Sequence, residues 1–235
     1  MAEFKRDCKS FPGTYACEIM TAEGYKDCSE CIFYEPIKKK ILIIQFGAMG
    51  DVIRTTSIIP AIKEKYGRDI KITWLTSENC RYLLENTSSV DEIITYSQEL
   101  NLRLQQEFFD VLFNLEITPP ATQLANVIQA TEKFGYYFDK DGHPSAFNEG
   151  AEEYLEIALS NHINRNTQKT YQALIFKALN LEYKKQPYTF KPKINEGYLN
   201  KFLQERNLTK EDKIIGINVG SGSRFPSKTW SLEKV

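Results

Sequence analysis

A chain of 235 residues that is 42% hydrophobic can bury a substantial core, as one large domain or two modest ones. Its net charge of −1 and its isoelectric point of about 6.2 argue against a general electrostatic attraction to nucleic acid or to anionic membranes. No apolar run approaches the roughly 20 residues of a membrane-spanning helix, and residues 1–10 lack the apolar centre of a signal peptide. We therefore expect a cytoplasmic protein, and the sequence also allows peripheral attachment at the inner face of a membrane.

Residues 1–38 differ from the rest of the chain, because they hold Cys8, Cys17, Cys28 and Cys31 and show little periodicity. We expect an irregular arm here. The last two cysteines have the C-x-x-C spacing of a zinc knuckle, and a short arm without its own core gains stability from a metal. Structural zinc is the first interpretation, with an iron–sulfur cluster, free thiols and disulfides as alternatives. Four cysteine ligands leave no open position on a metal, so we expect no catalytic role.

Strands and helices alternate after this arm. The expected strands cover residues 41–46, 69–76, 91–96, 109–116 and 133–138. One helix is expected to begin at Asp51. Three more are expected to cover residues 79–86, 100–108 and 122–130. Such alternation predicts an α/β fold, a Rossmann-like parallel sheet with helices on both faces.

The C-terminal half is predicted to begin with two helices. They cover residues 152–161 and 170–181, and a polar stretch at 162–169 links them. A helix at 196–206 and a strand at 213–219 follow. We expect three regions: the arm at 1–38, a Rossmann-like domain at 39–195, and a linker helix with the start of a second domain at 196–235.

The segment FGAMGDVIRTT places Gly47, Gly50 and Asp51 where the first strand passes into a helix. Ligands of open α/β sheets bind at such turns, and glycine lets the backbone turn sharply and approach a ligand closely. The carboxylate of Asp51 could act on a ligand, or it could merely cap its own helix. The spacing is not that of the G-x-G-x-x-G dinucleotide fingerprint, so nicotinamide binding is not supported.

A second glycine- and serine-rich turn, GSGSRFPSKTW, follows the expected strand at 213–219. Backbone N–H groups at a helix start attract anions, so Ser221, Ser223 and Lys228 could hold a phosphate or pyrophosphate. The alternative is an ordinary flexible loop with a solvated lysine. The segment lacks the spacing of a Walker A motif.

The two segments together resemble glycosyltransferase family 9, which includes the lipopolysaccharide heptosyltransferases. The first motif of the family matches Gly47, Gly50, Asp51, Thr56 and Pro60. The second motif matches Gly220, Ser221, Ser223, Lys228 and Trp230. Residues 135–159 and 164–183 also resemble a branch of these proteins, so the resemblance covers about residues 38–235.

This resemblance implies the N-terminal, acceptor-side half of a GT-B fold. It also implies inverting, metal-independent transfer of a sugar such as heptose from a nucleotide-sugar donor to a surface-glycan or lipopolysaccharide-type acceptor, with no catalytic cofactor and no nucleic acid partner. Asp51 would be the general base, while Ser221, Ser223 and Lys228 would bind the donor phosphates. Gly47, Gly50 and Arg54 would form the acceptor-side loop, in which Arg54 either meets an anionic acceptor or is a surface arginine.

Members of this family carry a whole C-terminal domain, of which this sequence contains only the expected start. We therefore expect an incomplete fragment, with weak or absent sugar transfer by these 235 residues alone. The alternative is a non-catalytic α/β binding module whose metal-stapled arm docks a partner.

Overall fold

The computed structural model describes residues 1–85, 87, 89–191, 195–209 and 211–217. The chain divides into two units, Met1–Pro192 and Lys193–Val235. In the part of the chain that the structure describes, no helix has the length and apolar character needed to cross a membrane.

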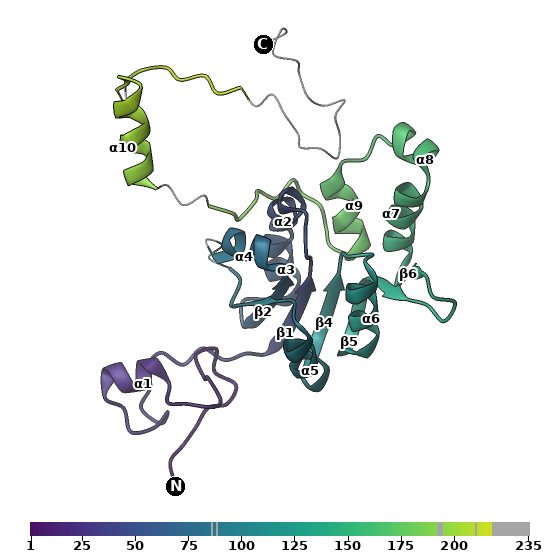
Figure 1. The fold of residues 1–235 in the computed structure, drawn as a ribbon. Coiled ribbons are helices and arrows are strands. Elements are labelled where there is room, and N and C mark those ends of the chain that lie inside the picture. The colour runs from purple at the N-terminus through teal and green to yellow at the C-terminus, as the bar shows by residue number, and fades with distance from the viewer. Residues whose placement is uncertain (86, 88, 192–194, 210, 218–235) are drawn as a thin grey trace. The chain divides into compact units, whose positions relative to one another are not determined.

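The first unit is built on a six-stranded sheet with the order β3-β2-β1-β4-β5-β6 (Figure 1). The strands are β1 Lys39–Ile44, β2 Ile70–Thr76, β3 Glu92–Thr95, β4 Phe108–Asn114, β5 Gln129–Phe138 and β6 Pro144–Ala146. Strands β1 to β5 are parallel, and β6 pairs antiparallel with β5. The predicted parallel, Rossmann-like sheet is therefore confirmed, with one antiparallel strand added at its edge.

Helices cover both faces of this sheet (Figure 1). They are α2 Met49–Thr55, α3 Ile58–Tyr66, α4 Glu78–Glu85, α5 Gln98–Gln106, α6 Pro119–Val127, α7 Glu149–Leu159, α8 Asn161–Asn166 and α9 Tyr171–Ala178. Because successive side chains of a strand point to opposite faces, β1 contributes to two cores. Ile41 and Ile43 pack in the core that includes Ile59 of α3, and Leu42 lies in the core that includes Leu124 of α6.

The arm that precedes β1 is mostly irregular. It contains one short helix, α1 Glu18–Glu23, and an isolated antiparallel bridge between Cys8 and Pro36. None of residues 1–38 is buried. Backbone hydrogen bonds rather than a hydrophobic core therefore hold the described arm together.

Three predicted elements differ in the structure. The helix expected at 122–130 ends at Val127, because Gln129 already pairs with Phe108 at the start of β5. The polar linker expected at 162–169 contains the short helix α8, which Ser160 caps by accepting a hydrogen bond from the Ile163 amide. A pairing between residues far apart in the sequence decides the first difference, and a local cap decides the second.

The strand expected at 213–219 is also wrong over its described residues. The second unit contains α10 Glu196–Glu205, and residues 213–217 form neither helix nor strand. Ile214, Ile215 and Ile217 are exposed. An apolar run of this type becomes a strand only when neighbouring strands pair with it, and residues 213–217 pair with no other part of the chain that the structure describes.

Candidate functional site

The candidate site lies at the carboxyl end of β1, where the chain turns into α2. Helix α2 begins at Met49, and its N-cap is Ala48, which makes no side-chain cap. Asp51 is the third residue of the helix and not its cap, so the capping alternative is wrong. Its side chain is 31% exposed, which leaves the carboxylate open to a ligand at this edge of the sheet.

Arg54 lies one turn further along α2 and pairs with the carboxylate of Asp51. Its guanidinium carbon lies 3.9 Å from the centre of the Tyr171 ring, which comes from α9. The Tyr171 hydroxyl is 3.3 Å from Oγ1 of Thr55. Arg54 is thus held between an aromatic ring and a carboxylate, yet 41% of its side chain remains exposed.

Aromatic side chains from α7 and β5 continue the wall behind this arginine. The Tyr154 ring meets Tyr171 edge-on with centroids 6.1 Å apart, and the Tyr136 ring lies 6.5 Å from Tyr154. Burial raises the pKa of Tyr154 to about 12, and the negative charge of Asp51 adds to the shift. Burial also raises the pKa of Tyr171. These phenols therefore stay neutral at neutral pH.

A buried carboxylate, Glu116, fixes the turn that carries Asp51. Its Oε1 accepts hydrogen bonds from the amides of Phe46 at 2.7 Å and Gly47 at 3.0 Å, and from Nε2 of Gln45 at 2.9 Å. Burial raises the pKa of Glu116, these hydrogen bonds lower it in part, and the charge of Asp51 raises it further. Glu116 therefore connects the end of β4 to the beginning of the candidate site.

Asn114 in turn fixes Glu116. Its Nδ2 donates to the carbonyl oxygens of Tyr136 at 2.7 Å and Glu116 at 3.1 Å, and its Oδ1 accepts from the Glu116 amide at 3.0 Å. Gly135 permits this arrangement, because it has a φ of +94° and a Cβ there would lie 1.8 Å from the Asn114 carbonyl oxygen. The support of the turn thus extends from β5 through β4 to β1.

The turn is also held from the β2 side. The Ser77 hydroxyl donates to the Phe46 carbonyl at 2.7 Å, and the Ser77 amide donates to the same oxygen at 3.3 Å. On the β4 side, Glu116 accepts a hydrogen bond from the Phe46 amide. Both neighbours of β1 in the sheet therefore fix the turn that precedes Asp51.

The two glycines of the turn keep backbone angles that other residues can also adopt. Neither Gly47 nor Gly50 has a positive φ. A Cβ on Gly47 would make only an ordinary contact, 3.9 Å from the Cys80 sulfur, and a Cβ on Gly50 would meet nothing within 4 Å. What Gly50 provides is open space beside Asp51, which suits the approach of a ligand.

The two remaining residues of the first motif, Thr56 and Pro60, support the fold near the site. Thr56 is buried, donates from its hydroxyl to the Ile53 carbonyl at 2.7 Å and accepts from the Thr189 amide at 3.1 Å. Pro60 occupies the first turn of α3, where a missing N–H costs no helical hydrogen bond. Thr56 therefore links the irregular segment around Thr189 to the end of α2 through hydrogen bonds.

The residues predicted to bind the donor phosphates, Ser221, Ser223 and Lys228, lie outside the described residues, as do Gly220 and Trp230. The four cysteines of the arm line one small cavity. No group of three or more His, Cys, Asp or Glu side chains among the described residues is arranged to hold a metal ion.

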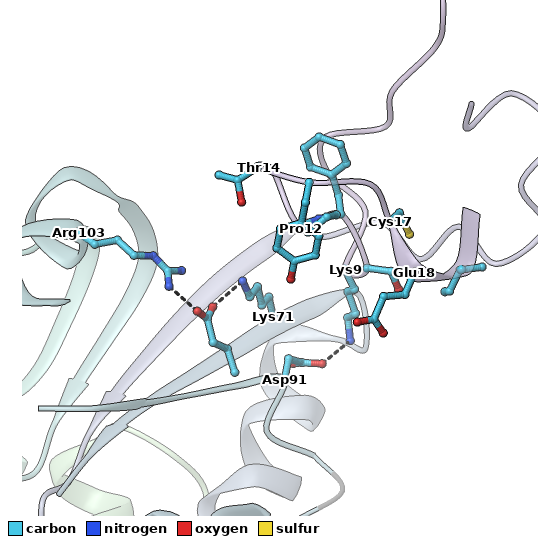
Figure 2. A pocket seen from close by; sticks show the side chains of 13 residues that line it. Lys9, Pro12, Thr14, Cys17, Glu18, Lys71, Asp91 and Arg103 are labelled. Carbon is cyan, nitrogen blue, oxygen red and sulfur yellow. Dashed lines mark hydrogen bonds and ion pairs between the residues drawn. The ribbon is translucent and has the colours of Figure 1, made fainter. Parts of the chain in front are cut away.

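A larger cavity of about 820 Å³ lies between the arm and the opposite, amino-terminal edge of the sheet (Figure 2). An ion pair between Lys9 and Asp91, at 3.2 Å, joins the arm to this edge. Glu92 pairs with Lys71 at 2.7 Å and Arg103 at 2.6 Å. Burial alone would raise the pKa of Glu92, but the hydrogen bonds from Arg103 and Lys71 lower it to about 2.

The sequence predictions missed Glu116, Asn114, Tyr154 and Tyr171. A signal for the first two exists, because Asn114 is the last residue of β4 and Glu116 follows two residues later. Parallel neighbours end at the same edge of the sheet as β1. The tyrosines lie on helices more than 100 residues after Asp51 in the sequence, and only the packing of α7 and α9 brings them near.

Comparison with known proteins finds this chain similar to a curated heptosyltransferase and to a solved glycosyltransferase structure. No protein-family model matches the chain. Lipopolysaccharide heptosyltransferase 1 of Campylobacter coli is 26% identical over 194 residues, which cover 77% of this chain and 55% of that protein. The crystal structure of the glycosyl transferase family 9 protein from Veillonella parvula has a TM-score of 0.57 at 20% identity, over 83% of this chain and 57% of its own.

A further structure, the E. coli heptosyltransferase WaaC with ADP, has a TM-score of 0.43 at 15% identity, over 63% of this chain and 50% of its own. The chain spans about half the length of the relatives that it matches. Over that stretch, the chain is similar to the heptosyltransferases of glycosyltransferase family 9, and the resemblance that its two motifs indicated is confirmed.

Proposed function

We propose that the chain is the acceptor-side part of an inverting, metal-independent glycosyltransferase. The donor would be a nucleotide sugar, with heptose as the first candidate sugar, and the acceptor a lipopolysaccharide-type glycan. The observation that carries this proposal is the position of Asp51, a part-exposed carboxylate at the carboxyl edge of the sheet, in a turn fixed by Glu116 and Ser77. Such an edge is where open α/β sheets bind ligands.

Asp51 would act as the general base. Its carboxylate would take the proton of an acceptor hydroxyl as that oxygen forms a bond to the anomeric carbon of the donor sugar. The bond from the anomeric carbon to the diphosphate breaks on the opposite side, and the nucleoside diphosphate leaves with the electron pair. The sugar is therefore joined with inverted configuration, and the proton remains on Asp51 until solvent takes it.

Arg54 would serve the acceptor. The stack on Tyr171 and the ion pair with Asp51 fix its guanidinium beside the base, while a large part of the side chain remains accessible. A planar guanidinium suits bidentate binding of a phosphate or carboxylate. An anionic group of the acceptor bound there would bring a neighbouring hydroxyl to Asp51.

On the donor side, the leaving diphosphate needs fixed hydrogen-bond donors. Ser221, Ser223 and Lys228 and the backbone around them would supply those donors. An acceptor embedded in the inner membrane would make the protein cytoplasmic and peripheral to that membrane. No cofactor enters this reaction.

The first experiment is calorimetric titration of ADP, UDP and GDP into this chain and into a form that extends through a complete C-terminal donor-side domain. We expect the extended form alone to bind one of the three, which would also name the donor nucleotide. The absence of binding by both forms would count against a transferase.

A second experiment tests the base directly in the extended form, with sugar transfer as the readout. The Asp51→Asn change should lower kcat by about 100- to 10,000-fold, because general-base catalysis contributes that much, while nucleotide binding stays unchanged. The matched control is Asp141→Asn, a change at an exposed loop residue. Equal activity of the two variants would remove Asp51 from the mechanism.

A second candidate function is a non-catalytic binding module. The observation in its favour is the cavity of about 820 Å³ between the arm and the sheet, which is lined by Phe11, Pro12 and Tyr15 as well as by charged groups. A module of this kind would keep its partner when Asp51 is replaced and lose it when Cys28 and Cys31 are replaced. The transferase predicts the reverse dependence for sugar transfer.

A further inference from the structure

The four cysteines of the arm converge on one place in the structure. Cys8, Cys17, Cys28 and Cys31 are spread over 24 positions of the sequence, yet all four line a single cavity of about 20 Å³. A cavity of this size has room for about one water-sized sphere. All four are free thiols, and none is buried to the degree of Cys80, the fifth cysteine, which is a residue of α4.

Backbone hydrogen bonds bring these distant cysteines together. The Cys28 amide donates to the Glu3 carbonyl at 2.8 Å, and the Lys9 amide donates to the Glu35 carbonyl at 2.9 Å. The bridge between Cys8 and Pro36 lies beside them. The start and the end of the arm are thus laid against each other, and a cysteine from each lies at the junction.

The pair Cys28 and Cys31 forms a tight turn at this junction. The Cys31 amide donates to the Cys28 carbonyl at 3.4 Å, so both side chains leave the same turn. Asp27 also lines the cavity, but its carboxylate already accepts from the Ser29 amide at 2.9 Å and the Ser29 hydroxyl at 2.6 Å. The four sulfurs are therefore the ligands that the cavity offers.

The arm also lacks another source of stability. None of its residues is buried, and α1 contributes no buried residue. Segments of fewer than about 40 residues fold independently only with disulfides, metals or a partner surface. Four thiols that line one small cavity are the set of ligands that a structural thiolate site of zinc uses.

We propose that the four-cysteine cavity is a structural site for one zinc ion. The four thiols lose their protons to solvent, and their sulfurs become the tetrahedral ligands. The described residues do not already form a metal-holding group, so the sulfurs must move inward to about 2.3 Å from the ion. The arm has no buried core to resist that movement.

Zinc at this site would also shape the larger cavity of Figure 2. Cys17 and Phe11 line both cavities. Fixing Cys17 on a metal would therefore fix one wall of the space in which Lys9 pairs with Asp91. The proposal does not depend on sugar transfer, because it concerns the arm alone.

The test measures metal content in the full 235-residue chain, purified under reducing conditions without chelators. We expect one zinc per chain by elemental analysis and native mass spectrometry. Replacing zinc by Co²⁺ should give the intense visible and near-ultraviolet absorption of a tetrahedral thiolate site. This spectrum tests the proposal on the unaltered protein, so it does not depend on whether a variant folds.

Variants then assign the ligands. Residues that merely orient a metal ligand change metal affinity by about 10- to 100-fold, so loss of a ligand in Cys28→Ser or Cys31→Ser should weaken zinc binding by at least about 100-fold. Cys80→Ser is the matched control and should leave affinity unchanged. Fluorescence of the buried Trp74 reports whether the sheet remains folded in each variant.

Three results would overturn the proposal. The first is a chain that binds neither zinc nor Co²⁺ when all its thiols are reduced. The second is a mass lower by two or four hydrogens in the purified protein, which indicates disulfides between the arm cysteines. The third is iron together with inorganic sulfide in place of zinc.

Discussion

In β1, residues Ile41–Ile44 are completely shielded from solvent, whereas no residue of the arm at 1–38 is buried. The two regions adjoin in sequence, and the amide of Lys38 hydrogen-bonds to the Asp69 carbonyl immediately before the sheet begins. Burial of apolar surface stabilises the strand, and it does so without any ligand. The arm has backbone hydrogen bonds, ion pairs and four thiols instead. The same chain therefore contains one region that apolar burial determines and one whose order depends on polar partners.

The largest expected difference in stability is between two Ile→Ala variants, one in β1 and one in the arm. Ile43→Ala opens a cavity in the central strand and should lower the free energy of unfolding by about 2–5 kcal/mol. Ile32→Ala removes a side chain of the arm that is 80% exposed and should change it by less than about 0.5 kcal/mol. Denaturant unfolding followed by Trp74 fluorescence measures both. Similar losses from the two changes would show that the arm has a core of its own.

A smaller effect is expected at the polar edge of the sheet. Glu116→Ala leaves the amides of Phe46 and Gly47 without their acceptor and should cost about 1–3 kcal/mol. Glu116→Gln keeps an acceptor oxygen and should cost less. If Glu116→Ala lowered the free energy of unfolding less than Glu116→Gln does, the side chain of Glu116 would not be what holds the turn.

The pH dependence of Glu116 sharpens this test. Its pKa is raised above the ordinary value of 4.5, so its contribution to stability is fully present below that value and is lost as pH rises through the raised pKa. The wild type should therefore lose stability relative to Glu116→Gln as pH rises from 4.5 through the raised pKa of Glu116. Denaturation curves at a series of pH values measure the difference, and parallel profiles would remove Glu116 as its source.

The opposite sign is expected where the arm meets the sheet. The pKa of Glu92 is lowered to about 2, so its contribution is present above the ordinary value of 4.5 and is lost as pH falls from there toward 2. Glu92→Gln should remove about 1 kcal/mol at neutral pH, because solvent screens this partly exposed cluster. Glu85→Gln, at an exposed pair with Arg81, is the matched control. A flat acid profile for the wild type would refute the assignment.

The smallest effect on stability is expected at Arg54. Its ion pair and its stack on Tyr171 are both partly exposed, so Arg54→Ala should cost no more than about 1 kcal/mol. Arg54→Lys keeps the charge and should cost less. Thermal unfolding of both variants provides the measurement, and a loss well above 2 kcal/mol would assign Arg54 to the fold rather than to an acceptor.

The sequence predicted most of what burial determines. The strand at Ile41–Ile44 could be read from its unbroken apolar run, and the end of that run located Asp51 at the sheet edge. The same reasoning failed at 213–217, because an apolar run does not show whether a partner strand exists. It also failed to place Glu116, whose three donors come from residues about 70 positions earlier in the chain.

The arm shows the converse limit. Its cysteine spacing predicted a set of ligands, and the structure gathers Cys8, Cys17, Cys28 and Cys31 around one cavity. The backbone path that gathers them, through Glu3 and Glu35, follows no periodic pattern. The spacing of cysteines can therefore predict which side chains act as ligands in such a segment. Its conformation depends on contacts between residues far apart in the sequence.

The two outer strands of the sheet have a consequence for the behaviour of the protein at high concentration. Strand β3 has four residues and β6 has three, and the first residue of β6 is Pro144, which has no amide proton to offer. Short edges with few free backbone groups give another chain little to pair with. The longer open edge lies along residues 129–135 of β5, which pair with β4 on one side and with no other described strand. Glu132 and Lys133 place charges there, and charged side chains on an edge disfavour pairing with another chain.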